Sequence, residues 1–176
     1  CYGITALFLG PIQRFFISEA VFNGYLVYLP HGVSVLATML FGWKAFLPLL
    51  VGHFGGRYFF PSEHLVETMA LPVILTAACS FFAFEVFRRC GKDCYANEAR
   101  DTHWRAVFAV GVLAALIGAL GQSLLLPAPG SVGDITSQYA FVAAGNIWGL
   151  FVFLFVLMFL FRWARLYGSR GSKEQS

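Results

Sequence analysis

The chain of 176 residues is 59% hydrophobic and 18% aromatic but only 12% charged, whereas a soluble domain carries about 25% charged side chains. With a mean hydropathy of +0.71, this composition excludes a soluble enzyme and a disordered protein, and it predicts an all-α transmembrane bundle in a lipid bilayer. The net charge of +3 is gathered beside apolar runs, so it indicates membrane topology and argues against a nucleic-acid partner.

Stretches without Asp, Glu, Lys or Arg predict where the chain crosses the membrane. In the first third of the sequence we expect a first span within residues 2–29, although Arg14 and Glu19 interrupt its apolar character. The runs 20–43 and 45–60 are expected to form shorter, tightly connected helices, with turns at Pro30 and Gly42. Three later stretches are each long enough for a hydrocarbon layer of about 30 Å, and they lie at 68–84, 106–133 and 135–161. The prediction is about six spans in one domain over residues 1–168, with a polar tail over 169–176.

The distribution of Lys and Arg predicts the orientation of these spans. Basic residues crowd the segment 88–105 and recur after Phe161, whereas 127–137 contains none. Because cytoplasmic loops are enriched in Lys and Arg, we expect 88–105 and both termini in the cytoplasm, with Pro30 on the outer side and Lys44 inside. The expected location is the bacterial inner membrane, crossed several times.

The segment 88–105 is the only long polar connection between predicted spans. We expect it to dock another integral membrane protein through basic and aromatic side chains, which are Arg88, Arg89, Trp104 and Arg105. The alternative is a solvated linker whose charges only set the topology.

Polar side chains inside the predicted spans are the best indicators of a binding site, because such groups are costly in hydrocarbon and normally face the bundle interior. Four of them are expected to line one outward-opening cavity for a small-molecule ligand, with His31 at its outer mouth; they are His31, His53, Gln122 and Asn146. The alternative is that each of them only hydrogen-bonds across helices as packing. We expect Asn146 to point inward, with Gly145 and Gly149 admitting the span that carries Gln122.

Catalytic and metal-binding patterns are not found. The sequence has no GxSxG, HExxH, P-loop or GxGxxG motif, so we expect neither an enzyme nor a cofactor. Cys90, Cys94 and His103 lack the fourth ligand of a structural zinc site, and no metal site is predicted. A haem held by His31 and His53 would need ligands at one depth, but on the predicted topology they differ by about 8 Å.

Small residues in the span 106–133 predict its place in the bundle. Gly111, Ala115 and Ala119 repeat every four residues, and Ala114 and Gly118 repeat on the adjacent face. Such spacing permits close helix packing in membranes, so this span is expected at the centre.

Two short segments resemble the membrane-associated sensor domains of the MASE type. The first is YLPHGVSVLATMLFGWKAFLPLLVG at 28–52, where the matching positions are Pro30, Gly32, Gly42, Trp43, Lys44, Pro48 and Gly52. The second is AAGNIWGLFVF at 143–153, with Asn146 where the family usually has an aspartate. Length and span number are also similar to the S components of energy-coupling-factor transporters, which bind vitamins.

These resemblances imply two functions. The MASE-type resemblance implies a non-enzymatic sensory or partner-binding accessory subunit of a larger membrane complex, and because only a short tail follows Phe161, we expect the signal to pass to a separate protein. The S-component resemblance implies binding and uptake of a small molecule.

Overall fold

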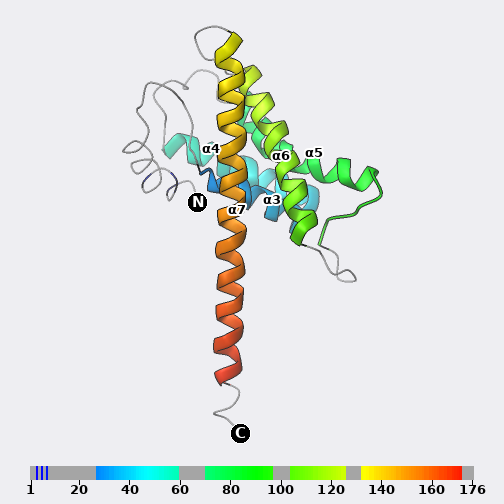
Figure 1. The fold of residues 1–176 in the computed structure, drawn as a ribbon, viewed down its shortest axis with the longest axis vertical. Coiled ribbons are helices and arrows are strands. Elements are labelled where there is room, and N and C mark those ends of the chain that lie inside the picture. The colour runs from blue at the N-terminus through cyan, green and yellow to red at the C-terminus, as the bar shows by residue number, and fades with distance from the viewer. Residues whose placement is uncertain are drawn as a thin grey trace.

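In the computed structural model, every regular element of the described residues is a helix. The structure describes residues 27–59, 70–96, 104–125 and 132–171, together with Gly3, Thr5 and Leu7. The elements are α3 (Leu29–Phe41), the 3-10 helix η2 (Gly42–Ala45), α4 (Phe46–Phe59), α5 (Ala70–Arg89), α6 (Trp104–Leu125) and α7 (Val132–Gly171) (Figure 1). The predicted all-α fold is confirmed for this part of the chain.

Four helical segments are long and apolar enough to cross a bilayer. Among the described residues they are Leu29–Gly56, Ala70–Arg89, Trp104–Leu125 and Ile135–Arg165. They bear out the prediction of a helical membrane protein at this coarser level. The predicted first span, within residues 2–29, lies almost wholly outside the described residues.

The first of these segments folds back on itself. The Ser34 hydroxyl and His53 Nε2 lie 3.2 Å apart although they are 19 residues apart in sequence; one continuous helix would separate them by about 28 Å. The chain reverses at Gly42, whose φ is +57°, as the sequence predicted. Helices α3 and α4 have 13 and 14 residues, or about 20 Å each, so they are the shorter, tightly connected helices that were expected, although each is too short for a full crossing of about 30 Å.

Helix α6 lies at the centre of the bundle, as its small residues predicted. Gly111, Ala114, Ala115, Gly118 and Ala119 are all buried. A Cβ added at Gly111 would collide with the Leu150 side chain of α7, and one at Gly118 would lie 3.4 Å from the Cys79 sulfur of α5. The small residues therefore let neighbouring helices approach on two sides.

The core lies at the end of the bundle where α5 ends and α6 begins. It joins residues from α3, α5, α6, α7 and the connection after α5, which are Val35, Ala83, Phe84, Cys94, Val107, Val110, Ala114 and Leu150. Because Cys94 belongs to this core, part of the predicted polar loop packs against the helices.

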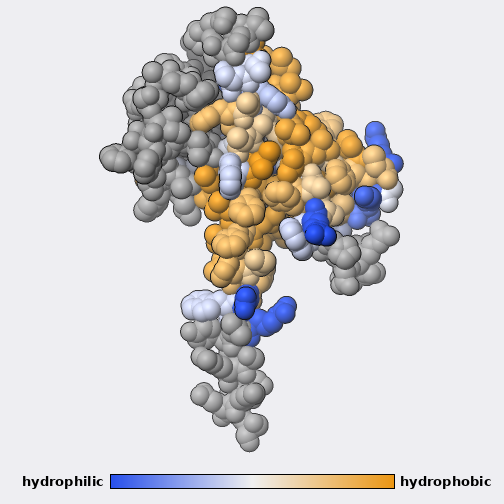
Figure 2. Space-filling view, viewed as in Figure 1, coloured by the Kyte–Doolittle hydropathy of each residue, from blue (hydrophilic) through white to orange (hydrophobic). Residues whose placement is uncertain are grey.

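Helix α7 is a single helix of 40 residues, about 60 Å long, and it continues past the expected boundary at residue 168. Its C-terminal half extends beyond the other labelled helices (Figure 1), and the hydrophobic surface of the bundle continues onto it (Figure 2). The exposed apolar residues of this half are Phe155, Val156, Met158, Phe159, Leu160, Phe161 and Trp163.

The connection between α5 and α6 is shorter than predicted. Arg88 and Arg89 form the last turn of α5, and Trp104 and Arg105 begin α6. The four residues assigned to a docking loop therefore lie on helix ends, because the helices continue past the apolar stretches into charged residues.

Candidate functional site: a polar junction between α3, α6 and α7

The non-helical backbone of Tyr28, just before α3, packs directly on α7. The Tyr28 N–H donates to the Gly145 carbonyl at 3.0 Å, and a Cβ added at Gly149 would collide with the Tyr28 carbonyl. Gly145 and Gly149 lie near the middle of the uncharged stretch 135–161. Interrupted backbone is tolerated at membrane depth only where protein or a cavity surrounds it, and here protein does.

Pro30 and His31, expected on the outer side and at an outer mouth, are both buried, and Pro30 lies in the first turn of α3; their side of the membrane stays a prediction. Another prediction about this region was wrong. The neighbour admitted by Gly145 and Gly149 is the Tyr28 backbone rather than α6.

His31 connects α3 to α6. Its side chain is 2% exposed, and its Nε2 lies 3.0 Å from the Gly111 carbonyl oxygen. Because a carbonyl can only accept, Nε2 carries the hydrogen and donates it. The carbonyl of Gly111 thus contacts His31, and Leu150 occupies the space where a side chain at position 111 would lie.

Ser34 joins the second histidine to the same helix. Its hydroxyl donates to the Pro30 carbonyl at 3.0 Å, which uses its only hydrogen, so His53 Nε2 must donate to the Ser34 oxygen at 3.2 Å. Thr38 in turn donates to the Ser34 carbonyl at 2.8 Å. The result is a buried polar chain along one face of α3.

The two histidines are linked through Ser34. Ser34 is three residues from His31, a rise of about 4.5 Å along α3, and His53 contacts Ser34 directly. The difference in depth of about 8 Å, expected from the predicted topology, stays a prediction. The Nε2 atom of each ring is engaged by protein, so the rings do not present a shared pair of Nε2 atoms to a haem iron.

Asn146 is buried, with 4% of its surface exposed, which confirms the prediction that it points inward. Successive helix residues are 100° apart. On α7, Phe153 faces Gly32 of α3, while Leu150 faces Gly111 of α6. Viewed along the helix axis, the side chain of Asn146 points between the directions of Phe153 and Leu150. Its amide is not hydrogen-bonded to another described residue, but it is not among the fully buried side-chain atoms without a partner, which in this part of the chain are Ser80 Oγ and Ser123 Oγ.

Gln122 does not join this junction. Its amide nitrogen donates to Thr76 Oγ1 at 3.3 Å, and Thr76 donates to the Pro72 carbonyl at 2.7 Å. Gln122 is eleven residues from Gly111, about 16 Å along α6. Gln122 therefore lies between α5 and α6, apart from His31 and Ser34 of α3 and from the His53 that contacts Ser34, while Asn146 is buried on α7.

The sequence interpretation missed Ser34 and Thr38, which connect the site. Their signal was their spacing, because His31, Ser34 and Thr38 are at positions i, i+3 and i+7, on one face of a helix. Thr76 and Ser80 of α5 are four residues apart, as Ser34 and Thr38 are, and so also share one face of a helix.

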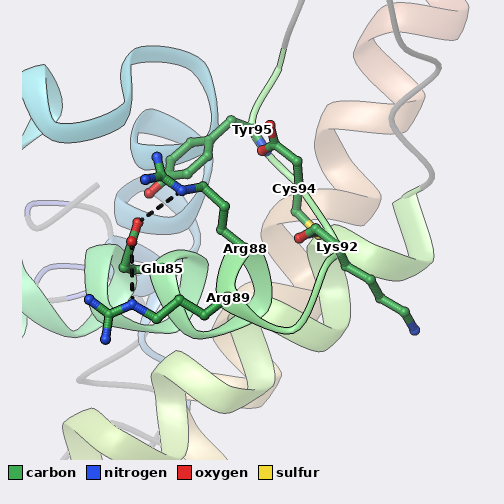
Figure 3. Close-up of polar contacts among 7 residues, drawn as sticks. Glu85, Arg88, Arg89, Lys92, Cys94 and Tyr95 are labelled. Atoms are coloured by element: carbon green, nitrogen blue, oxygen red, sulfur yellow. Dashed lines mark hydrogen bonds and ion pairs between the residues drawn. The ribbon is translucent and has the colours of Figure 1, made fainter.

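A second polar region lies where α5 ends. Glu85 forms ion pairs of 3.5 Å with Arg88 and 3.6 Å with Arg89, and both arginines are largely exposed (Figure 3). Arg105 lies 5.9 Å from the ring centre of Trp104. These residues remain a predicted docking surface, with part of its charge balanced by Glu85.

The connection after α5 is held against α3. Tyr95 stacks on Phe84 with ring centroids 5.0 Å apart, and the Ala96 N–H donates to the Met39 carbonyl at 2.9 Å. Burial, followed by the charge of Glu85, raises the pKa of Tyr95. The turn between α3 and α4 therefore lies beside the basic end of α5.

No group of three or more His, Cys, Asp or Glu side chains within the described ranges could hold a metal ion. Cys90 is exposed and Cys94 is buried, while His103 lies outside the described residues. Burial, followed by the neighbouring Asp93 carboxylate, raises the pKa of the Cys94 thiol.

No family model, curated protein or solved structure matches this chain.

Proposed function

We propose that this chain is a non-enzymatic, sensory accessory subunit of a larger membrane complex. It binds a small molecule at the junction of α3, α6 and α7, and the occupied site changes how α7 engages another integral membrane protein. The observation that carries the proposal is the continuity of α7, since one uninterrupted helix contains both the buried Asn146 and the exposed apolar half beyond Phe153.

Asn146 supports the ligand-binding part of this proposal. Burying an amide that makes no hydrogen bond costs about 1–3 kcal/mol of folding free energy on the scale of protein mutations, and a ligand that bonds the amide would offset this cost. No Asp, Glu, Lys or Arg is among the buried polar residues that the structure describes, and this favours a small, uncharged, hydrogen-bonding ligand.

The exposed half of α7 supports the partner-binding part. Phe151, Phe155 and Phe159 follow one another at intervals of four residues, with successive ring centroids 6.2 and 4.8 Å apart. A shallow groove of about 370 Å³ is lined by Phe155 and Phe159 together with Val156, Leu160 and Trp163. A regular aromatic ridge beside a groove gives a second transmembrane helix a surface to pack on, whereas lipid needs no such shape.

The proposed topology keeps both termini in the cytoplasm of a bacterial inner membrane, but with fewer than six crossings, because α3 and α4 are each only about 20 Å long. The packing of Ala96 on Met39 supports the expected common side for Lys44 and the basic end of α5. The resemblance to MASE-type domains supports the sensory role.

The second proposal is small-molecule uptake, in the manner implied by the S-component resemblance. The same Asn146 amide, which is not hydrogen-bonded to another described residue, also favours small-molecule uptake. The two functions differ at α7, because capture of a ligand requires no partner on the exposed aromatic ridge.

Gentle purification from native membranes, followed by mass spectrometry of the bound proteins and small molecules, tests both parts. We expect Asn146→Leu to lose the small molecule, and Phe155→Asn with Phe159→Asn to lose the partner. Phe82→Asn is the matched control, since Phe82 is an exposed phenylalanine on α5. A free monomer without ligand or partner would contradict the proposal, and a ligand without a partner would favour uptake.

A further inference from the structure

A set of cations from three separate parts of the chain meets at one end of the bundle. Lys44 comes from the turn between α3 and α4, Arg88 and Arg89 end α5, Lys92 follows, and Arg105 begins α6. All five are exposed. We name these five residues the basic end; part of it is drawn in Figure 3.

The fold, rather than sequence proximity, brings Lys44 to this place. The Ala96 N–H bonds to the Met39 carbonyl, near the end of α3, and a Cβ added at Gly42 would lie 3.9 Å from the Tyr95 ring. The turn and the connection after α5 therefore share one side of the bundle.

The basic end keeps an excess of positive charge after its internal ion pairs are considered. Glu85 and Asp93 are the two carboxylates among the described residues of this region, so five cations leave a net charge of +3. One carboxylate, Glu85, is shared by Arg88 and Arg89. Each arginine keeps donors free for another anion.

Two tryptophans place this charge at the membrane surface. Trp43 is 72% and Trp104 is 71% exposed, and both lie beside members of the basic end. Tryptophan is enriched at the level of lipid head groups, while the ends of α5 and α6 are also the ends of membrane-crossing segments. An anion at this depth, held by several cations at once, is the phosphate of a lipid.

We propose that the basic end binds the head group of an anionic phospholipid, with the guanidinium groups on the phosphate and Trp43 and Trp104 beside the upper acyl chain. This site is independent of the polar junction and of the partner on α7. Each cation at a membrane surface contributes about 1 kcal/mol of attraction to anionic lipid, a factor of about five in affinity.

The test is native mass spectrometry of the full chain, equilibrated with mixed phosphatidylcholine and phosphatidylglycerol of identical acyl chains. The wild type should retain phosphatidylglycerol preferentially. Arg88→Gln with Arg89→Gln should reduce that preference at least tenfold, and Glu85→Gln should increase it by releasing both arginines. The control is Arg162→Gln with Arg165→Gln, which removes two exposed cations from α7.

Three outcomes would overturn the proposal. Equal retention of the two lipids would show that the basic end does not select anionic head groups. An equal loss in the α7 control would show that charge anywhere on the surface suffices. If Cys90 reacts with maleimide in pure lipid vesicles but is protected in native membranes, and no lipid preference is found, a protein covers the basic end instead.

Discussion

Gly149→Ala is expected to loosen the contact between α7 and the start of α3. The added Cβ would collide with the Tyr28 carbonyl and lie 2.8 Å from the Tyr28 nitrogen. These are backbone atoms, so the clash cannot be relieved by a side-chain rotation. The Tyr28 N–H to Gly145 hydrogen bond must lengthen or break as the two segments move apart.

The size of the effect follows from three contributions. Overpacking costs about 1–3 kcal/mol, and weakening one membrane hydrogen bond costs about 0.6 kcal/mol. Alanine recovers about 1 kcal/mol through its higher helix propensity. The expected net loss is about 2 kcal/mol in the free energy of unfolding, or a fall of about 4–8 °C in Tm for a chain of this size.

Thermal unfolding in mild detergent, followed by circular dichroism at 222 nm, measures this loss. Gly52→Ala is the matched control, because a Cβ there meets nothing within 4 Å and only the gain in helix propensity remains. Its Tm should equal or exceed that of the wild type. If Gly149→Ala is as stable as Gly52→Ala, the close packing of Tyr28 on α7 is wrong.

Three other substitutions or reactions follow from the same structure. Asn146→Leu should raise Tm slightly in ligand-free protein, since it removes a buried amide that is not hydrogen-bonded to another described residue. A fall in Tm would reveal a hydrogen bond that stabilises the fold. Ser34→Ala should lower the free energy of unfolding by about 1 kcal/mol because His53 loses its acceptor, while a neutral result in a denaturant titration would contradict that bond. Maleimide should label exposed Cys90 before buried Cys94. Because the pKa of Cys94 is raised, its thiolate, and hence its labelling, should appear only above the pH at which an ordinary thiol reacts. Equal pH profiles of the two cysteines in a mass-resolved time course would refute this order.

The helical membrane fold was predictable because it depends on hydrophobicity along the chain, and α5, α6 and α7 appear at the uncharged stretches. Their ends were misplaced because charged residues such as Arg88 and Arg105 continue the helices beyond the apolar core. The centrality of α6 was also predictable, since only small side chains allow the packing at Gly111 and Gly118.

The short lengths of α3 and α4 and the turn at Gly42 were expected, but their position in the layer was not. Composition distinguishes apolar from polar segments, but it does not show whether a short helix crosses the layer or folds back within it. Only a contact between distant residues, such as Ser34 with His53, shows that the chain reverses within the layer.

The candidate site was predicted in part for a related reason. Each buried polar side chain could be picked out individually, and His31, His53 and Asn146 are all buried. Gln122 was grouped with them by its nominal depth, yet its partner Thr76 is on α5. Which helix faces which is set by three-dimensional packing, and one sequence does not specify it.

The central claim is that the polar junction lies deep in the bilayer, and the native tryptophans allow a direct measurement of depth. Trp148 is adjacent to Gly149 on α7 and is 55% exposed, whereas Trp43 and Trp104 mark the basic end. In vesicles, variants that keep one tryptophan each can be quenched by lipids carrying a nitroxide at a shallow or a deep acyl position. The deep nitroxide should quench Trp148 most, and the shallow one should quench Trp43 and Trp104 most. Strongest quenching of Trp148 by the shallow nitroxide would place the junction at the membrane surface and show that it does not lie deep in the bilayer.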